Sequence, residues 1–383
     1  IAAATAHVAY VFHEHGEACR NMSKRNTVLR QFNTSDTQVP TVLHVVEKFD
    51  TGVGAAIEAI VASTPEFKHL VAACRGSEKV DALDTYPLPT GHLAAALEVR
   101  RLVRSLTPDI VHAHSSFGGL YSRWFRWARP RVFQPHCYSF ERLSFPAPLR
   151  TMFVAVERLL ARRSDATVAV GSYEARLARG RVVARIVVLV PNSSSVRTQV
   201  LAGSGRQGTS DDPIVIVGAG RVCAQKDPLL FAEVAKLVRA VRPEIQFCWL
   251  GDGDSRLTDA LVDAGVSVTG WLGSEGVREK LSTATCFLHT AAWEGFPISV
   301  LDAASLELPV VGRDIGPLRD EGLATYSDAR GLAAATLKCV DSAEVRADLV
   351  ARSAQLANRM CRDRQRAQIR ALYVKQLQEV CAA

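Results

Sequence analysis

The chain has 383 residues and a formal net charge of +7, with 48% hydrophobic and 22% charged residues. Its length predicts two or three domains with sizeable cores, and its composition is that of a soluble globular protein. Charged residues interrupt the longest apolar runs before the roughly 18 residues that a membrane-spanning helix needs, so no such helix is expected.

The first 40 residues differ in character from the rest. They are polar and irregular, and they lack the apolar core and small-residue cleavage site of a secretory signal. We therefore expect residues 1–40 to form a poorly structured N-terminal extension outside the fold. The nine cysteines are scattered without a CxxC pair, which favours free thiols in a reducing cytoplasm over disulfides or a zinc site.

Residues 41–195 alternate short apolar runs with longer helical patterns, the signature of βα units around a parallel sheet. The helical stretches include Leu93–Leu106 and Leu149–Arg163. The expected strands are Thr41–Val46, His69–Ala73, Ile110–His114, Arg131–Gln134, Thr167–Val170 and Val187–Val190. This part of the chain is predicted to be an N-terminal Rossmann-like domain.

A stretch rich in Ser and Gly, residues 196–212, has the composition of a linker. The βα pattern then restarts and predicts a second Rossmann-like domain over residues 213–360. Residues 361–383 show helical periodicity with a basic first part. The strands expected in the second domain are Ile214–Val217, Ile245–Leu250, Val266–Thr269, Cys286–His289 and Val310–Val311.

The fold class that follows is α/β, with two doubly wound parallel-sheet domains facing a cleft. In such sheets ligands bind beyond the carboxyl ends of the strands. Charge is uneven: residues 41–190 hold 20 basic and 13 acidic side chains, whereas residues 201–360 hold 16 and 21. The basic half is expected to face an anionic partner, but no RRM, KH or helix-turn-helix signature supports nucleic acid.

Two glycine turns follow strands of the second half. Both GAGRVC (218–223) and GDGDSR (251–256) lack the third glycine of the dinucleotide fingerprint, which argues against a dehydrogenase. Arg221 and Lys226 follow the first turn and precede a helix that Asp227 would cap. Two cations beside a helix N-terminus can hold a diphosphate, although two solvated surface charges would leave the same pattern.

One further segment carries two acids. The strand CFLH ends in a loop with Glu294, and Asp302 follows eight residues later, about one turn inside a helix. This spacing can place one carboxylate near each end of a bound ligand. The amides at the helix start, those of Ile298, Ser299 and Val300, would add a phosphate site. An acidic pair alone is common, and a capping Glu with a surface Asp is the more usual explanation of such a pair.

The ordered set of motifs resembles family 4 of the glycosyltransferases, retaining enzymes of the GT-B fold that use nucleotide-activated sugars. The resemblance covers roughly residues 41–383. In chain order the motifs are TGVG (51–54), DIVHAHS (109–115), VPNS (190–193), GAGRVCAQKDP (218–228), LGDGDSR (250–256) and WEGFPISVLDAASLELPVV (293–311). By this resemblance the final helix would cross back onto the first domain.

The resemblance implies roles for the residues of the second half. Arg221 and Lys226 would neutralise the donor diphosphate, Glu294 would contact the donor sugar as a catalytic residue, and Asp302 would bind the ribose hydroxyls. The family usually has Glu in place of Asp302, and many relatives have Gly in place of Pro297. The shorter Asp still accepts hydrogen bonds from a diol, and Pro is tolerated at a helix start.

The remaining site residues belong to loops. Gly52 and Gly54 would let the first loop approach the sugar phosphate closely, and Gly295 and Phe296 would complete the donor-binding loop. His136 matches the family's histidine that reaches the transferring sugar, against the alternative of a loop-end histidine without substrate contact. One of the two histidines in VHAHS is expected to be structural.

The resemblance also implies a mechanism. In front-face attack the departing phosphate takes the acceptor proton, so cations and helix amides stabilise the leaving group. The sequence has no DxD-type acidic cluster, so neither a metal nor another cofactor is expected. Two alternatives remain open: a sugar-nucleotide 2-epimerase, and a degenerate homologue that binds a nucleotide or a partner without turnover.

The expected partners are a UDP- or GDP-sugar donor and an acceptor hydroxyl, with a lipid-linked acceptor or exopolysaccharide assembly as a hypothesis. Three segments mix Arg with Trp, Phe and Leu, as an interfacial surface does: RRLVR (100–104), SRWFRWARPR (122–131) and ERLLARR (157–163). Each segment alone also fits a helix with a solvated basic face. We expect a cytoplasmic protein, with the anionic inner face of the membrane as a candidate partner.

Overall fold

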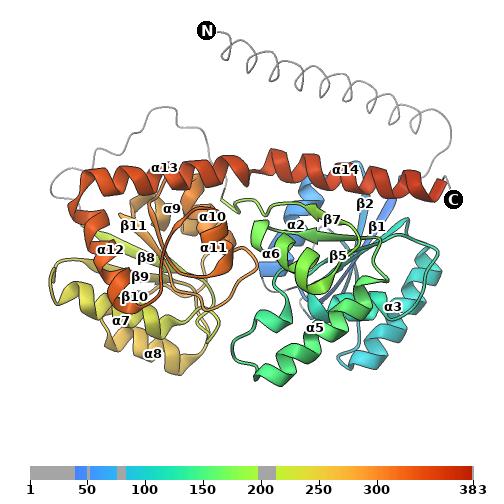
Figure 1. Ribbon diagram of the computed structural model, residues 1–383, viewed down its shortest axis with the longest axis horizontal. Coiled ribbons are helices and arrows are strands. Elements are labelled where there is room, and N and C mark those ends of the chain that lie inside the picture. The colour runs from blue at the N-terminus through green and yellow to red at the C-terminus, as the bar shows by residue number, and fades with distance from the viewer. Residues whose placement is uncertain (1–38, 50–51, 76–82, 197–212, 382–383) are drawn as a thin grey trace, which may run out of the picture. The chain divides into compact units, whose positions relative to one another are not determined.

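The computed structural model describes residues 39–49, 52–75, 83–196 and 213–381 (Figure 1). Most of the expected N-terminal extension, residues 1–38, and nearly all of the expected linker, residues 197–212, lie outside this part of the chain. The described residues contain two parallel sheets, each covered by helices. Two doubly wound α/β domains, as expected from the sequence, are therefore confirmed.

The first sheet has seven parallel strands in the order β3-β2-β1-β4-β5-β6-β7. Six of them were expected, and their ends agree with the prediction to within two residues. The strand missed, β3, is a four-residue edge strand whose side chains are exposed or half-buried, so it has no apolar run. The strands are β1 (Thr41–Lys48), β2 (Lys68–Arg75), β3 (Asp84–Pro87), β4 (Ile110–His114), β5 (Arg131–Gln134), β6 (Ala166–Ala169) and β7 (Val187–Leu189).

Alternate residues of the first sheet pack against different helices, because successive side chains of a strand point to opposite faces. Leu43 and Val45 of β1 pack with residues of α3, whereas Val42 packs on the other face. His44 alternates with Leu43 and therefore shares the face of Val42. The helices are α2 (Gly52–Ser63), α3 (His92–Leu106), α4 (Ser115–Arg123), η2 (Ser139–Glu141), α5 (Ala147–Ala161), α6 (Ser172–Leu177) and η3 (Ala178–Val182).

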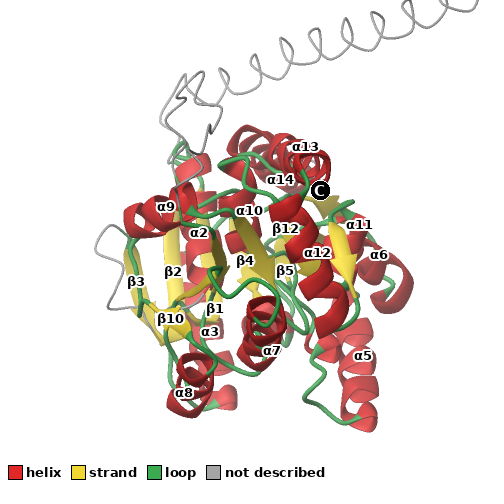
Figure 2. Cartoon of the chain, turned by 90° about the vertical axis from the view of Figure 1, so that its left-hand side faces the viewer, coloured by secondary structure: helices red, strands yellow, loops and turns green. Residues whose placement is uncertain are grey.

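The second sheet has six parallel strands in the order β10-β9-β8-β11-β12-β13, and helices lie around the strands (Figure 2). The strand missed, β13, has only three residues, all half-buried. The strands are β8 (Val215–Ala219), β9 (Gln246–Leu250), β10 (Val266–Val268), β11 (Cys286–His289), β12 (Val310–Arg313) and β13 (Ala324–Tyr326). The helices are α7 (Pro228–Arg239), α8 (Ser255–Asp263), α9 (Ser274–Thr283), α10 (Ile298–Ser305), α11 (Gly316–Asp320), α12 (Ala329–Asp341) and α13 (Ala343–Arg359).

Each sheet has one point at which the strand order reverses, between β1 and β4 in the first and between β8 and β11 in the second. Loops leaving the carboxyl ends of such neighbouring strands diverge to opposite faces and leave a crevice for ligands. The loop after β8 carries Arg221 and Lys226, and the loop after β11 carries Glu294 and leads into α10 with Asp302. The topology thus places them at the expected kind of site.

The last helix, α14 (Arg362–Cys381), follows α13 (Figure 1) but completes the core of the first domain. Its residues Ile369, Leu372 and Tyr373 pack with Val42 of β1 and Ile60 of α2. Its polar residues add long-range hydrogen bonds, since Gln365 Nε2 donates to Pro191 O at 3.0 Å and Arg370 Nε donates to Glu66 Oε1 at 2.7 Å. The first domain therefore depends on residues from the end of the chain.

This dependence can be tested by shortening one buried side chain of α14. Ile369 is fully buried, so Ile369→Ala should lower the free energy of unfolding by about 2–5 kcal/mol. Arg366→Ala, an exposed change in the same helix, should stay within about 0.5 kcal/mol of the parent. Urea unfolding measures both, and equal stabilities of the two variants would contradict this role of α14.

Candidate functional site

The turn after β8 is built around Gly220. Its φ of +137° lies in a region that residues with side chains rarely adopt. A Cβ atom at this position would lie 2.7 Å from Lys226 Cε. Its carbonyl accepts a hydrogen bond from Trp249 Nε1 at 2.9 Å. The missing side chain gives room for the aliphatic part of Lys226 to fold back over the turn. Asp227 then caps α7 by accepting from Leu230 N, as expected.

Lys226 and Glu294 meet at this edge of the second sheet. Lys226 Nζ lies 2.6 Å from Glu294 Oε1, and the two side chains are only 18% and 10% exposed. Gln225 Nε2 donates to Trp293 O at 3.0 Å, and Ala292 N donates to Gln225 O at 2.8 Å, which joins the loop after β8 to the loop after β11. The structure therefore brings together two residues that lie 68 positions apart.

Arg221 belongs to the same loop but differs in its surroundings. It is exposed, and its side chain forms no ion pair with any residue that the structure describes. Arg313 at the end of β12 is instead held by Asp227, with Nη1 and Oδ2 2.7 Å apart. Arg221 thus keeps its full charge available for an anionic ligand, whereas the charge of Arg313 is already compensated.

The start of α10 offers fewer free amides than expected. The amide of Val300 donates to Pro297 O at 3.2 Å because the first turn of the helix is tightened, so the expectation of a free Val300 amide is wrong. The amides of Ile298 and Ser299 have no partner among the described residues. The hydroxyl of Ser299 is buried and also lacks a partner there, whereas the sequence had pointed only to the amide of this residue.

Both oxygen atoms of the Asp302 carboxylate accept hydrogen bonds from the chain itself. Its Oδ1 accepts from Ser194 Oγ at 2.8 Å and from Ser195 N at 2.6 Å, and its Oδ2 accepts from Ser195 Oγ at 2.9 Å. Burial raises the pKa of Asp302, and these hydrogen bonds oppose that effect. Asp302 therefore anchors the segment after β7 onto α10. A ribose diol at this carboxylate would share or replace the Ser195 contacts.

The two glycines of the first loop differ in how closely the rest of the chain approaches them. A Cβ atom on Gly54 would lie 1.7 Å from Phe49 O, so only glycine lets α2 begin tightly against the end of β1. A Cβ atom on Gly52 would meet nothing within 4 Å. The close approach at Gly54 is thus made to the protein's own backbone, and contact of either glycine with a sugar phosphate stays a prediction.

His136 lies in the loop after β5, which has a strained backbone. His136 and Cys137 have φ values of +57° and +127°, both unusual for residues with side chains. Burial raises the pKa of the nearby Glu174 to about 7, and the backbone amides of Val170 and Cys137 oppose this rise. The carbonyl of His136 sits 2.5 Å from where a Cβ of Gly295 would be. The loop of His136 therefore touches the loop of Glu294.

Phe296, the residue after Gly295, packs in a hydrophobic core and has a structural role. Its side chain is buried in the core of the second domain with Val170 and Met360. Its carbonyl accepts a hydrogen bond from Asn192 Nδ2 at 3.0 Å. Asn192 belongs to the VPNS motif, so this motif helps to hold the loop of Glu294. Contact of Phe296 with a donor stays a prediction.

A cluster of buried histidines lies beneath His136. His44, His112 and His114 form the one group of side chains in the described residues that could hold a metal ion, with nitrogen atoms within 4.8 Å of one another. His44 Nδ1 and His114 Nε2 already hydrogen-bond each other at 2.9 Å. Sequence reasoning missed His44 and His69. The register of β1 and β4, which pairs His44 with His112, was the signal that could have found this cluster.

The contact at Gly295 generates a test. Gly295→Ala places a methyl group against backbone atoms of His136 and Cys137, so at least one of the two loops must shift. We expect a loss of about 1–3 kcal/mol in the free energy of unfolding. Gly273→Ala is the matched control, because a Cβ there meets nothing within 4 Å. Chemical unfolding of both variants decides, and equal stability would show that the loops do not touch.

Comparison with known protein families gives two matches, one in each domain. Residues 63–193 match the glycosyl transferase 4-like domain, and residues 213–342 match glycosyl transferases group 1. The chain is similar to an uncharacterized 41.2 kDa protein from the cps region of Klebsiella pneumoniae, with 22% identity over 295 residues, 72% of this chain and 82% of that protein. It also resembles an Escherichia coli α-1,3-galactosyltransferase that acts on UDP-Gal and α-D-GlcNAc-diphosphoundecaprenol, with 29% identity over 28% of this chain and 30% of that enzyme.

Solved structures share the two-sheet fold. Sucrose-phosphate synthase from Thermosynechococcus elongatus superimposes with a TM-score of 0.73 at 14% identity, covering 90% of this chain and all of that chain. Anabaena HepE in complex with UDP and glucose gives a TM-score of 0.69 at 15% identity, covering 88% and 100%. With both domains matched by glycosyltransferase families and the motifs in their expected order, the chain belongs to the family 4 glycosyltransferases of the GT-B fold.

Proposed function

We propose that this chain is a retaining, metal-independent hexosyltransferase that moves a sugar from a nucleoside-diphosphate sugar to an acceptor hydroxyl. One observation carries the proposal: the loop after β8 supplies two cations, and the start of α10 supplies two amides that have no partner among the described residues. These are the exposed Arg221, the paired Lys226 and the amides of Ile298 and Ser299. Such groups suit a diphosphate.

The chemistry requires stabilisation of charge on the leaving diphosphate. In the front-face mechanism that we propose, a phosphate oxygen takes the acceptor proton, so the protein supplies cations and amides rather than a nucleophile. Lys226 would exchange part of its contact with Glu294 for the diphosphate. Glu294 would then have oxygen atoms available for hydroxyls of the donor sugar.

The relatives support a uridine donor over a guanosine donor. HepE structures contain UDP with glucose and UDP-glucose, and the E. coli relative is named for UDP-Gal. We therefore propose a UDP-sugar as the donor, with GDP-sugars as the comparison. The hydrogen bonds that the chain itself makes to Asp302 are the observation that favours the degenerate alternative, a homologue without turnover, because a ribose would have to share or displace them.

The donor proposal is tested by thermal unfolding with UDP, GDP, ADP and their common sugar conjugates. A ligand at about 100 times its dissociation constant adds about 2.7 kcal/mol, enough to raise Tm visibly. We expect a shift with UDP or UDP-sugars that is reduced in Arg221→Ala and Lys226→Ala. Arg278→Ala, which removes an exposed charge from α9, is the control and should keep the shift.

Either of two results would contradict the donor proposal. A full shift in both Arg221→Ala and Lys226→Ala would remove these side chains from the diphosphate site. No shift with any nucleotide would favour the degenerate homologue. A shift together with turnover of the UDP-sugar alone, without loss of nucleotide, would instead indicate a 2-epimerase.

The three basic segments of the first domain lie side by side. Arg100 Cζ of α3 lies 5.0 Å from the centroid of the Phe125 ring, and Arg163 Nη1, just after α5, donates to Arg123 O at 3.3 Å. Large apolar side chains are more than half exposed nearby, among them Trp124 after α4 and Leu159 on α5. No helix in the described part of the chain combines the length and apolarity needed to cross a bilayer.

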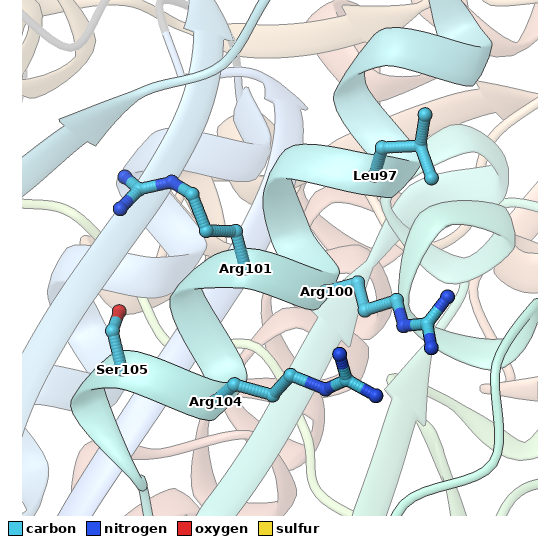
Figure 3. Close-up of a pocket in the computed structure, with 5 residues that line it drawn as sticks. All are labelled: Leu97, Arg100, Arg101, Arg104 and Ser105. Atoms are coloured by element: carbon cyan, nitrogen blue, oxygen red, sulfur yellow. The ribbon is translucent and has the colours of Figure 1, made fainter.

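A hollow of about 470 Å³ lies on the outer side of α3 (Figure 3). It is lined by one apolar and three basic side chains and a serine: Leu97, Arg100, Arg101, Arg104 and Ser105. Arginine beside exposed apolar groups suits an anionic lipid surface. We propose that this surface docks on the inner, cytoplasmic face of the membrane and that the acceptor is lipid-linked, in polysaccharide or exopolysaccharide assembly. The diphosphoundecaprenol acceptor of the E. coli relative supports this choice.

Vesicle sedimentation tests the membrane proposal. Binding to vesicles with anionic lipid should exceed binding to purely zwitterionic vesicles. Arg104→Glu should weaken it about tenfold, since one basic side chain contributes about 1 kcal/mol and its reversal adds repulsion. Lys236→Glu, the same charge reversal at an exposed position of α7, should bind as the parent does. Equal effects of the two reversals would show a nonspecific response to net charge and contradict docking through α3.

A further inference from the structure

Four histidines form a hydrogen-bonded chain that runs inward from the candidate site. His136 Nε2 lies 3.0 Å from His114 Nδ1, and His114 Nε2 lies 2.9 Å from His44 Nδ1. His44 Nε2 lies 3.0 Å from His69 Nδ1. His114, His44 and His69 come from the neighbouring strands β4, β1 and β2, and all three are buried. Each contact joins the Nε2 of one ring to the Nδ1 of the next.

The inner end of the chain has a fixed proton. His69 Nε2 lies 3.0 Å from the backbone oxygen of Thr64, which can only accept a hydrogen bond. It also lies 3.1 Å from Thr64 Oγ1, whose own proton is donated to Ile60 O at 2.7 Å. Both neighbours of this nitrogen are therefore acceptors. The Nε2 of His69 must carry the proton.

The position of the proton on the other three rings follows from that on His69. Burial lowers the pKa of His69, His44 and His114, and it lowers the pKa of His136 to about 3, so each ring is neutral and holds one proton. With its proton on Nε2, His69 accepts at Nδ1, so His44 must donate from Nε2. His44 then accepts at Nδ1 from His114 Nε2, and His114 in turn accepts at Nδ1. His136 must then donate from Nε2 and keep a lone pair on Nδ1.

We propose that His69, His44 and His114, here called the histidine relay, are positioning residues that fix His136 in its Nε2–H tautomer. His136 then presents a hydrogen-bond acceptor, Nδ1, to a hydroxyl of the transferred sugar. This inference rests on the proposed function and adds a reason for donor choice. The relay moves no proton, because its inner end is a backbone carbonyl.

The fixed tautomer sets the class of donor. A neutral acceptor matches a hydroxyl, which can donate, whereas a carboxylate at the same position of the sugar would bring two acceptors together without a proton. The site should therefore take neutral hexoses in preference to uronic acids. His136 also brings no positive charge to the leaving diphosphate, which leaves that role to Arg221 and Lys226.

Proton positions can be measured directly by long-range 1H–15N correlation in the full chain labelled with 15N-histidine. His136 is assigned as the ring whose signals vanish in His136→Gln. We expect His136, His114, His44 and His69 as neutral Nε2–H rings. A neutral Nδ1–H or a charged ring at His136 would overturn the proposal. A stoichiometric metal in the purified protein, bound by His44 and His114, would overturn it as well, because these nitrogens would then be ligands.

A pair of variants at the inner end separates the relay from simple packing. His69→Phe removes the acceptor for His44, so the Nδ1–H form of His136 should become populated. His69→Asn keeps an oxygen near the place of Nδ1 and should restore the Nε2–H form. His112→Asn is the control: its Nδ1 contacts Tyr373 at 2.8 Å, outside the relay, so the tautomer of His136 should not change.

Donor binding supplies the second measurement. The ratio of affinities for a UDP-hexose over UDP alone should fall about threefold to tenfold in His69→Phe, the loss expected for one hydrogen bond, and recover in His69→Asn. If His69→Phe changes the tautomer of His136 but leaves this affinity ratio unchanged, the proposed contact between His136 and the sugar is overturned. If no nucleotide binds to any variant while His136 is Nε2–H, the donor proposal fails and the fixed tautomer stands. If UDP-hexose binds while His136 is Nδ1–H, the inference fails and the donor proposal stands.

Discussion

The contact between Lys226 and Glu294 is the constraint around which the candidate site is arranged. It closes only because Gly220 lacks a side chain and lets the Lys226 stem fold back over the turn after β8. The contact ties the loop after β8 to the loop after β11, at the point where the strand order of the second sheet reverses. Partial burial strengthens the ion pair of Lys226 and Glu294 by excluding water. The exposed Arg221 is outside this pair, so its charge is available to an anionic ligand.

The first domain contacts this arrangement through both backbone and side-chain groups of its loops. The loop of His136 approaches Gly295 so closely that no side chain fits, while Asp302 holds the segment after β7 through Ser195. The histidine relay lies behind this contact, so the chemistry offered by the loop depends on strands β4, β1 and β2. Helix α14 covers the same face of the sheet and links its packing to the end of the chain.

Local pattern predicted much of this fold, because buried parallel strands are apolar throughout and Asp227 caps α7 by contacts within three residues. The edge strands β3 and β13 were not predicted because they are short and partly exposed. The motifs predicted which loops carry the site, and the structure joins Lys226 to Glu294. The partners of Asp302 lie more than 100 positions away, and the contacts of His44 cross to neighbouring strands over 25 and 70 positions, so no local residue pattern predicts either. The engaged amide of Val300 reflects a tightened first turn that no residue pattern signals.

A crystal structure of the chain with UDP would test the central claim most directly. The account predicts a diphosphate between the Arg221 side chain and the amides of Ile298 and Ser299, with Lys226 turned partly from Glu294 toward a phosphate oxygen. It also predicts that Ser195 gives up part of its contact with Asp302 to the ribose. A nucleotide bound elsewhere, or a diphosphate that touches neither Arg221 nor the start of α10, would contradict the account.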